Sequence, residues 1–151
     1  MRVTIAAVGR DRSSSARDLF DEYCRRCSWQ IRLVEIAPRS AVPLERRPAE
    51  EGARLAAAIP RDAAVVALDE RGRLLSSRSF AARIAGWQER GGDLAFLIGG
   101  ADGLADDLIG RAELVLALGR MTWPHRLVRV LLAEQLYRAS TILAGHPYHR
   151  D

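Results

Sequence analysis

Two stretches of the 151-residue chain hold side chains that can move protons or stabilise negative charge. One is GRMTWPHRLVRV, residues 119–130, where a glycine and a proline precede a long helical pattern. The other is the final HPYHRD, residues 146–151. His and Tyr can relay a proton and Arg can stabilise an anion, so both stretches suit acid–base chemistry. Five residues are catalytic candidates: His125, Arg129, Tyr148, His149 and Arg150.

Each candidate also has an ordinary structural explanation, and the residues alone do not decide between that explanation and a chemical role. His125 follows a proline and fits the first position of a helix, and Arg129 fits a link across an interface. Chain ends are more often disordered than functional. A tail with Tyr, two His and Arg in six residues is nevertheless chemically richer than a solvated end requires. We therefore favour a tail that closes over a substrate, and the proton acceptor stays unassigned.

Two further motifs are weak on their own. GGADGL, residues 99–104, has neither the G-x-G-x-x-G spacing of a dinucleotide site nor a P-loop lysine, and by itself it favours a tight turn over a ligand cradle. CRRC, residues 24–27, has no further cysteine or histidine nearby to complete a zinc site. The two cysteines are expected to be reduced thiols, and no metal is expected.

Length and composition indicate one domain over residues 1–151, because 48% hydrophobic content is enough for a single core at this size. Apolar runs such as 63–68 are far shorter than the ~20 residues of a membrane span, so we expect a cytoplasmic protein. The net charge is +4 and every basic residue is Arg. Arginine favours a polyanionic partner such as nucleic acid, although genomic base composition explains the missing lysine equally well.

Hydrophobic patterning predicts strands at 2–8, 29–36, 63–69, 94–98 and 113–118, with helices in the intervals and a last helix to about residue 144. The strand at 29–36 alternates and should have one partly exposed face. Residues 37–48 read as a surface connection and 70–73 as a turn. The alternation predicts an α/β fold with a mostly parallel sheet and helices on both faces.

Three of these strands end in residues suited to a ligand site: the pair Leu68 and Asp69, the pair Gly99 and Gly100, and the loop 119–124. In open α/β sheets, ligands bind beyond the carboxyl ends of the strands. The sequence therefore predicts that these three segments share one site.

The blocks FLIGGADGL, LGRMTWPHRLVRVLLAEQLYRA and HPYHRD, with VTIAAVGR and VVALDERG in register before them, resemble the ribosomal large subunit pseudouridine methyltransferase H family. That family belongs to the SPOUT class of S-adenosylmethionine-dependent RNA methyltransferases. The resemblance covers essentially the whole chain. It implies a C-terminal trefoil knot, one of the rare exceptions to unknotted chains, which periodicity alone does not reveal.

The resemblance further implies that the knot loops bind the methyl donor, and that the active site lies at a homodimer interface. The implied reaction is methylation of N3 of a pseudouridine in large-subunit ribosomal RNA. With no appended RNA-binding domain, the expected substrate is an assembled ribosome or subunit. The donor-binding residues carried over are Leu68, Gly99, Gly100, Gly119, Arg120, Met121, Thr122, Trp123 and Pro124.

A different class of function remains as an alternative. In it, the chain is a non-catalytic basic α/β module that binds ribosomal RNA or a ribosomal subunit, and the glycines serve only turns. Saturable binding of S-adenosylmethionine distinguishes the enzyme from this module.

Overall fold

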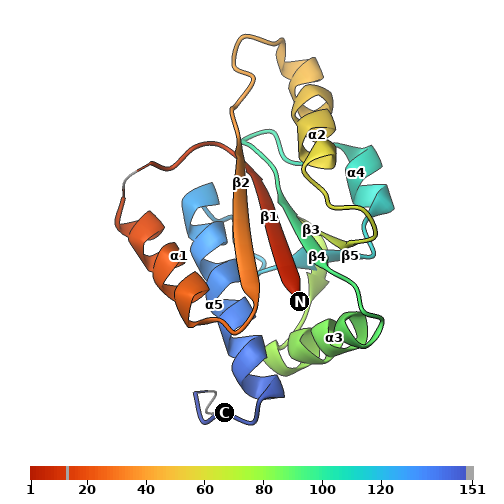
Figure 1. Ribbon diagram of the computed structural model, residues 1–151. Coiled ribbons are helices and arrows are strands. Elements are labelled where there is room, and N and C mark those ends of the chain that lie inside the picture. The colour runs from red at the N-terminus through yellow and green to blue at the C-terminus, as the bar shows by residue number, and fades with distance from the viewer. Residues whose placement is uncertain (13, 149–151) are drawn as a thin grey trace.

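A five-stranded sheet with the order β2-β1-β4-β3-β5 organises the chain. The computed structural model describes residues 1–12 and 14–148. All four strand pairings are parallel, as the sequence predicts (Figure 1). The strands are β1 Arg2–Val8, β2 Gln30–Ile36, β3 Ala64–Leu74, β4 Leu94–Ile98 and β5 Leu114–Ala117.

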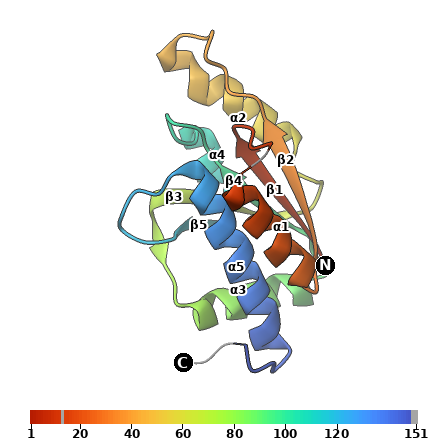
Figure 2. The same ribbon diagram turned by 90° about the vertical axis from the view of Figure 1, so that its left-hand side faces the viewer.

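Helices cover both faces of the sheet (Figure 2). The helices α1 Ser15–Arg26, α3 Ser77–Glu89 and α5 His125–Leu143 share one apolar cluster, and α2 Arg47–Ala57 and α4 Asp106–Arg111 share the other. Successive side chains of a strand point to opposite faces, so the central strands supply both clusters. On β1, Ile5 packs in the first cluster and Ala6 in the second. The α/β prediction is confirmed.

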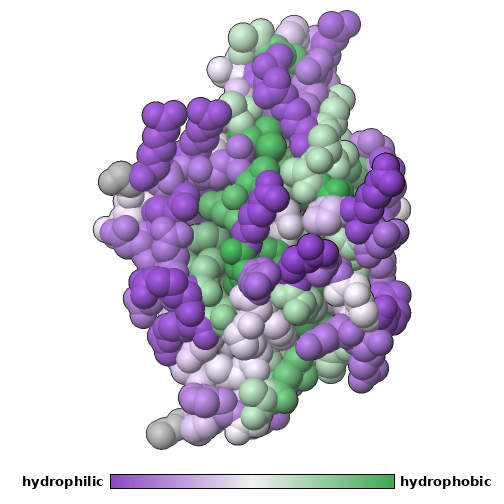
Figure 3. Space-filling view, in the orientation of Figure 1, coloured by the Kyte–Doolittle hydropathy of each residue, from purple (hydrophilic) through white to green (hydrophobic). Residues whose placement is uncertain are grey.

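The sheet interior and its edge differ in burial as the sequence predicts. Every residue of β4 is buried, which matches a continuous apolar strand covered on both faces. The edge strand β2 is only partly covered, and Figure 3 shows apolar side chains in a strip over it, between hydrophilic flanks. Among the described residues, no helix is long and apolar enough to cross a membrane.

Two predicted connections are wrong in detail. Residues 70–73, expected to be a turn, continue β3 to Leu74 after a register shift against β5. Gly72 permits this, because a Cβ there would lie 2.7 Å from the Leu116 carbonyl carbon. The connection 37–48 is shorter than expected, since a 3₁₀ turn at Leu44–Arg46 leads directly into α2 at Arg47. Pro48 suits the first turn of that helix, where its missing N–H is no loss.

Candidate functional site

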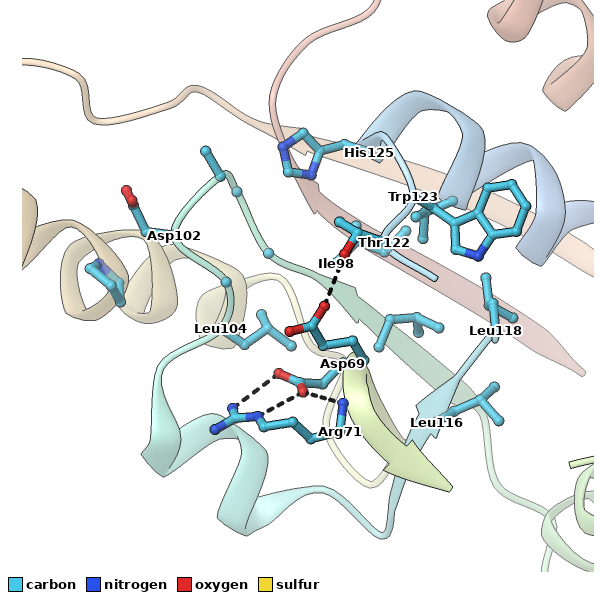
Figure 4. A pocket seen from close by; sticks show the side chains of 18 of the residues that line it. Asp69, Arg71, Ile98, Asp102, Leu104, Leu116, Leu118, Thr122, Trp123 and His125 are labelled. Atoms are coloured by element: carbon cyan, nitrogen blue, oxygen red, sulfur yellow. Dashed lines mark hydrogen bonds and ion pairs between the residues drawn. The ribbon is translucent and has the colours of Figure 1, made fainter. Parts of the chain in front are cut away.

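The carboxyl ends of β4 and β5 and the middle of β3, from Leu68 to Arg71, surround a cavity of about 850 Å³. The three segments predicted to share a site therefore do converge (Figure 4). Arg120 and Pro124 belong to the same loop as several lining residues but do not line the cavity. The predicted residues that do line it are Leu68, Gly99, Gly100, Gly119, Met121, Thr122, Trp123 and His125.

The glycine loop after β4 depends on close backbone approach. A Cβ at Gly99 would lie 2.5 Å from the carbonyl carbon of Gly103, closer than side-chain carbons pack in proteins. A Cβ at Gly100 would lie 2.9 Å from Glu51 Oε2 and 3.0 Å from a methyl group of Val8. Glycine therefore lets this loop fold on itself and bring its backbone to the cavity wall.

Carboxylates contribute to the cavity lining; sequence reasoning placed Asp69 at a strand end but missed the other carboxylates. Asp69 accepts hydrogen bonds from Arg71, at 2.9 Å from Nε, and this contact holds the pKa of Asp69 below its usual value. The extension of β3 beyond Asp69 places Glu70 and Arg71 here, in the segment 70–73 expected to be a turn. The acidic lining residues are Asp69, Glu70, Asp102 and Asp106.

The loop before α5 closes the opposite side. Thr122 Oγ1 donates a hydrogen bond of 3.2 Å to Glu70 Oε2 and so ties this loop to β3 (Figure 4). His125 is the first residue of α5, with Pro124 as the cap, and its side chain is exposed at the cavity. It is the catalytic candidate that the structure places with the predicted donor-binding residues.

Arg129 lies outside the cavity lining, and its guanidinium binds other parts of the protein. Its side chain is 5% exposed, and its Nη1 lies 2.7 Å from Glu35 Oε1. Its Nη2 donates to the carbonyl oxygens of Val8 at 3.0 Å and Gly9 at 2.8 Å. These bonds tie α5 to the ends of β1 and β2, which fits a positioning role rather than contact with reacting atoms.

Tyr148 also lies away from the cavity lining, against the side chains of Glu134, Tyr137 and Arg138 on α5. Nine to thirteen residues of helix separate these positions from His125, which is roughly 14 to 20 Å along the axis. The candidates His149 and Arg150 lie outside the described residues. In the part of the chain that the structure describes, no group of three or more His, Cys, Asp or Glu is placed to hold a metal ion.

A family model described as "Predicted SPOUT methyltransferase" matches residues 1–149. The chain belongs to this SPOUT methyltransferase family. It is similar to two curated proteins named ribosomal RNA large subunit methyltransferase H. The relative from Rhodospirillum centenum is 54% identical over 151 residues, with 99% of each chain covered. The relative from Paracoccus denitrificans is 51% identical over 155 residues, with 100% of each chain covered.

Solved structures agree on the SPOUT fold. A probable methylase family protein from Haemophilus influenzae superposes with a TM-score of 0.59 at 14% identity, covering 99% of this chain and 70% of that one. TrmJ from Z. mobilis superposes with a TM-score of 0.57 at 17% identity, covering 93% and 70%. At these identities the likeness concerns the fold alone.

Proposed function

We propose that this SPOUT methyltransferase transfers a methyl group from S-adenosylmethionine to N3 of a pseudouridine in large-subunit ribosomal RNA. The observation that carries the proposal is the convergence of the three strand-end segments on one cavity. The full-length similarity to proteins named ribosomal RNA large subunit methyltransferase H supports the choice of RNA.

The cavity suits the donor in size, shape and charge. A volume of about 850 Å³ falls within the range of small-molecule sites. Backbone groups of the glycine loop can approach an adenine edge, and Leu68, Met121 and Trp123 offer apolar walls. S-adenosylmethionine carries a net positive charge, which the carboxylate of Glu70 complements, whereas Asp69 is already paired with Arg71.

The chemistry at the target is the loss of one proton and the gain of one methyl group. The N3 proton must leave as the carbon–nitrogen bond forms and the carbon–sulfur bond of the donor breaks. When bound, the donor supplies the electrophilic methyl group. His125 stands where it can accept or relay the proton, because it lines the same cavity.

We also propose a homodimer that buries the loop before α5. Large apolar side chains are exposed there and at the start of α5, with Met121 75%, Trp123 39% and Leu127 43% exposed, and Met121 and Trp123 line the cavity. A second copy on this surface would cover the cavity mouth. Leu127→Glu is expected to shift the protein from dimer to monomer in sedimentation velocity, and a wild-type monomer would refute the dimer.

The terminal candidates His149 and Arg150 lie outside the described residues, and their part in the reaction stays a prediction. The C-terminal trefoil knot stays a prediction from the family resemblance, and the cytoplasmic location stays a prediction from the short apolar runs.

The test is methyl transfer to purified large subunits or ribosomes that lack the modification, read by mass spectrometry of RNA fragments. The proposal predicts one added methyl at a pseudouridine N3, and no incorporation would refute it. Calorimetry with S-adenosylmethionine distinguishes the methyltransferase from the alternative, because a non-catalytic RNA-binding module would give no saturable heat.

A further inference from the structure

Two neighbouring connections leave the sheet at the same end as the donor cavity (Figure 1). Residues 9–12 follow β1 and residues 37–46 follow β2, and they begin side by side, because the Gly9 N–H donates to the carbonyl oxygen of the last residue of β2 at 2.8 Å. The start of α5 lies against the first connection, since Arg129 Nη2 donates to the Gly9 carbonyl oxygen at 2.8 Å. One turn earlier on α5, His125 lines the cavity. The two connections therefore border the mouth of the cavity.

The carboxylates of this region point inward. Asp11 is 4% exposed, and its Oδ2 accepts a hydrogen bond of 2.7 Å from Ser14 Oγ. Glu51 is 5% exposed, and its Oε1 accepts the Arg39 N–H at 3.0 Å, which braces the second connection against α2. Glu35, near the end of β2, lies 2.7 Å from the buried guanidinium of α5 described above. The negative charge of these three side chains is therefore held largely inside the protein.

The arginines of the same region point outward. Arg10 and Arg12, on either side of Asp11, are exposed, and so is Arg46 in the 3₁₀ turn before α2. Arg126, in the first turn of α5, is 61% exposed, and its Nε lies 3.8 Å from Asp11 Oδ2. Within the described residues, Arg10, Arg12 and Arg46 form no ion pair. Figure 3 shows hydrophilic side chains around the connection between β1 and α1. The four exposed arginines are named here the arginine rim.

The cavity beside the arginine rim has the opposite charge. Four carboxylates line it against one arginine, Arg71. In residues 9–12 and 37–46, all of which the structure describes, Glu45 is the one exposed carboxylate. The mouth of the cavity is therefore basic on the side of β1 and β2 and acidic within. A polyanion is attracted to the first surface and repelled from the second.

We propose that the arginine rim binds the phosphate backbone of the RNA whose nucleotide enters the cavity. Arginine forks match phosphate oxygens, and an RNA strand repeats that charge at every nucleotide. Arginines on three separate segments fit several phosphates along a strand better than one small anion. The inference rests on the proposed function, because it places the RNA substrate of that reaction on the protein. The rim contacts position the RNA and touch no reacting atom.

The test measures the affinity for large ribosomal subunits at several salt concentrations, for the wild type and for Arg10→Gln/Arg12→Gln. Each phosphate contact contributes about 0.7–0.9 to the slope of log K against log salt, so the slope should become shallower by about 1.4–1.8. At about 0.1 M salt this corresponds to a loss of affinity of roughly 25- to 60-fold. The KM for subunits should rise accordingly, whereas kcat and the Kd for S-adenosylmethionine should stay within about twofold. Arg46→Gln and Arg126→Gln should each change the slope by about half as much.

The matched control is Arg61→Gln/Arg83→Gln, which removes the same charge from two exposed arginines at the opposite end of the sheet. Arg61 shortly precedes β3, and Arg83 belongs to α3, which lies at that end in Figure 1. The control should keep the wild-type slope. An unchanged slope in Arg10→Gln/Arg12→Gln, or an equal change in the control, would overturn the inference.

Protein-free large-subunit RNA identifies the partner. The rim variant should lose affinity for this RNA as it does for subunits. A loss for intact subunits alone would assign the rim to a ribosomal protein and would also overturn the inference. Affinity is read without methyl transfer, so a wild-type protein that binds subunits through the rim and transfers no methyl group would refute the proposed function alone.

Discussion

The donor cavity and the cluster around Tyr148 are built differently. Tyr148 and the four side chains around it are named here the tyrosine anchor, and the four are Arg26, Glu134, Tyr137 and Arg138. One wall of the cavity is formed by backbone, because the glycine loop folds too closely for a side chain at Gly99. The anchor is assembled from side chains, with Arg26 and Tyr148 brought together from the first and last parts of the chain. Helix α5 serves both regions, since it begins at the cavity with His125 and carries the anchor further along.

The largest effect, on the free energy of unfolding, is expected when Arg129 is replaced, because its bonds hold α5, the helix that contributes to both regions. Arg129→Ala removes the buried guanidinium that donates to Glu35 and to the carbonyl oxygens of Val8 and Gly9, and leaves Glu35 with Asp11 N–H and Arg17. Breaking a buried pair of this kind costs about 3–5 kcal/mol, so the free energy of unfolding in urea should fall by about that amount. Arg126→Ala, on the same helix with a side chain 61% exposed, should cost at most about 1 kcal/mol. Equal losses in the two variants would show that Arg129 does not hold α5.

A loss of donor affinity is expected from Gly99→Ala. The new methyl group would collide with the Gly103 backbone, so the loop must move and donor affinity should fall about 100-fold, or about 2.7 kcal/mol. Calorimetry with S-adenosylmethionine measures this. The control is Gly110→Ala in α4, where a Cβ meets no atom within 4 Å. It should leave donor affinity unchanged and add up to about 1 kcal/mol of stability. Wild-type affinity in Gly99→Ala would remove the glycine loop from the donor site.

The two regions also differ in how far sequence could predict them. The donor-binding segments follow buried apolar strands, and parallel strands bring their carboxyl ends to one edge, so Leu68, Gly100 and Thr122 could be grouped in advance. The place of Glu70 in the lining could not, because it begins the segment 70–73, which reads as a turn and continues as strand where Gly72 passes close to β5.

The anchor could not be predicted for a different reason. Tyr148 was singled out for its chemistry, but its contact with Arg26 depends on α1 and α5 packing side by side on one face of the sheet. Local periodicity says that each helix has an apolar face and does not say which helices become neighbours. The role of Arg129 is hidden in the same way, since its partners lie at the ends of β1 and β2.

A smaller loss of donor affinity is expected when the loop before α5 is released from β3. Thr122→Val removes the hydrogen bond to Glu70, which at this exposed position is worth about 0.5–1.5 kcal/mol. Donor affinity should fall roughly 2- to 10-fold, because the loop before α5 loses its tie to β3. Glu70→Gln and the double variant complete a double-mutant cycle by calorimetry. Fully additive losses would mean that the two side chains do not act together.

The smallest effect concerns ionisation in the anchor. The pKa of Tyr148 is raised to about 12, chiefly by burial, so the folded protein holds this proton more tightly than the unfolded chain. Its contribution to stability should be complete below the ordinary tyrosine value near pH 10 and lost as pH rises toward 12. Ultraviolet titration should show a tyrosine transition near pH 12 that Tyr148→Phe removes. A Tyr148 transition at the ordinary value would mean that the residue is solvated.

The central claim is that the three strand-end segments bind the methyl donor, and amide chemical-shift mapping tests it most directly. On addition of S-adenosylmethionine to the isotope-labelled protein, we expect saturable shifts at Leu68, Gly100 and the loop 119–123. The amides of Arg26 and Glu134 in the tyrosine anchor should stay unchanged. Shifts confined to the anchor, or no saturable shifts at the three segments, would contradict the account.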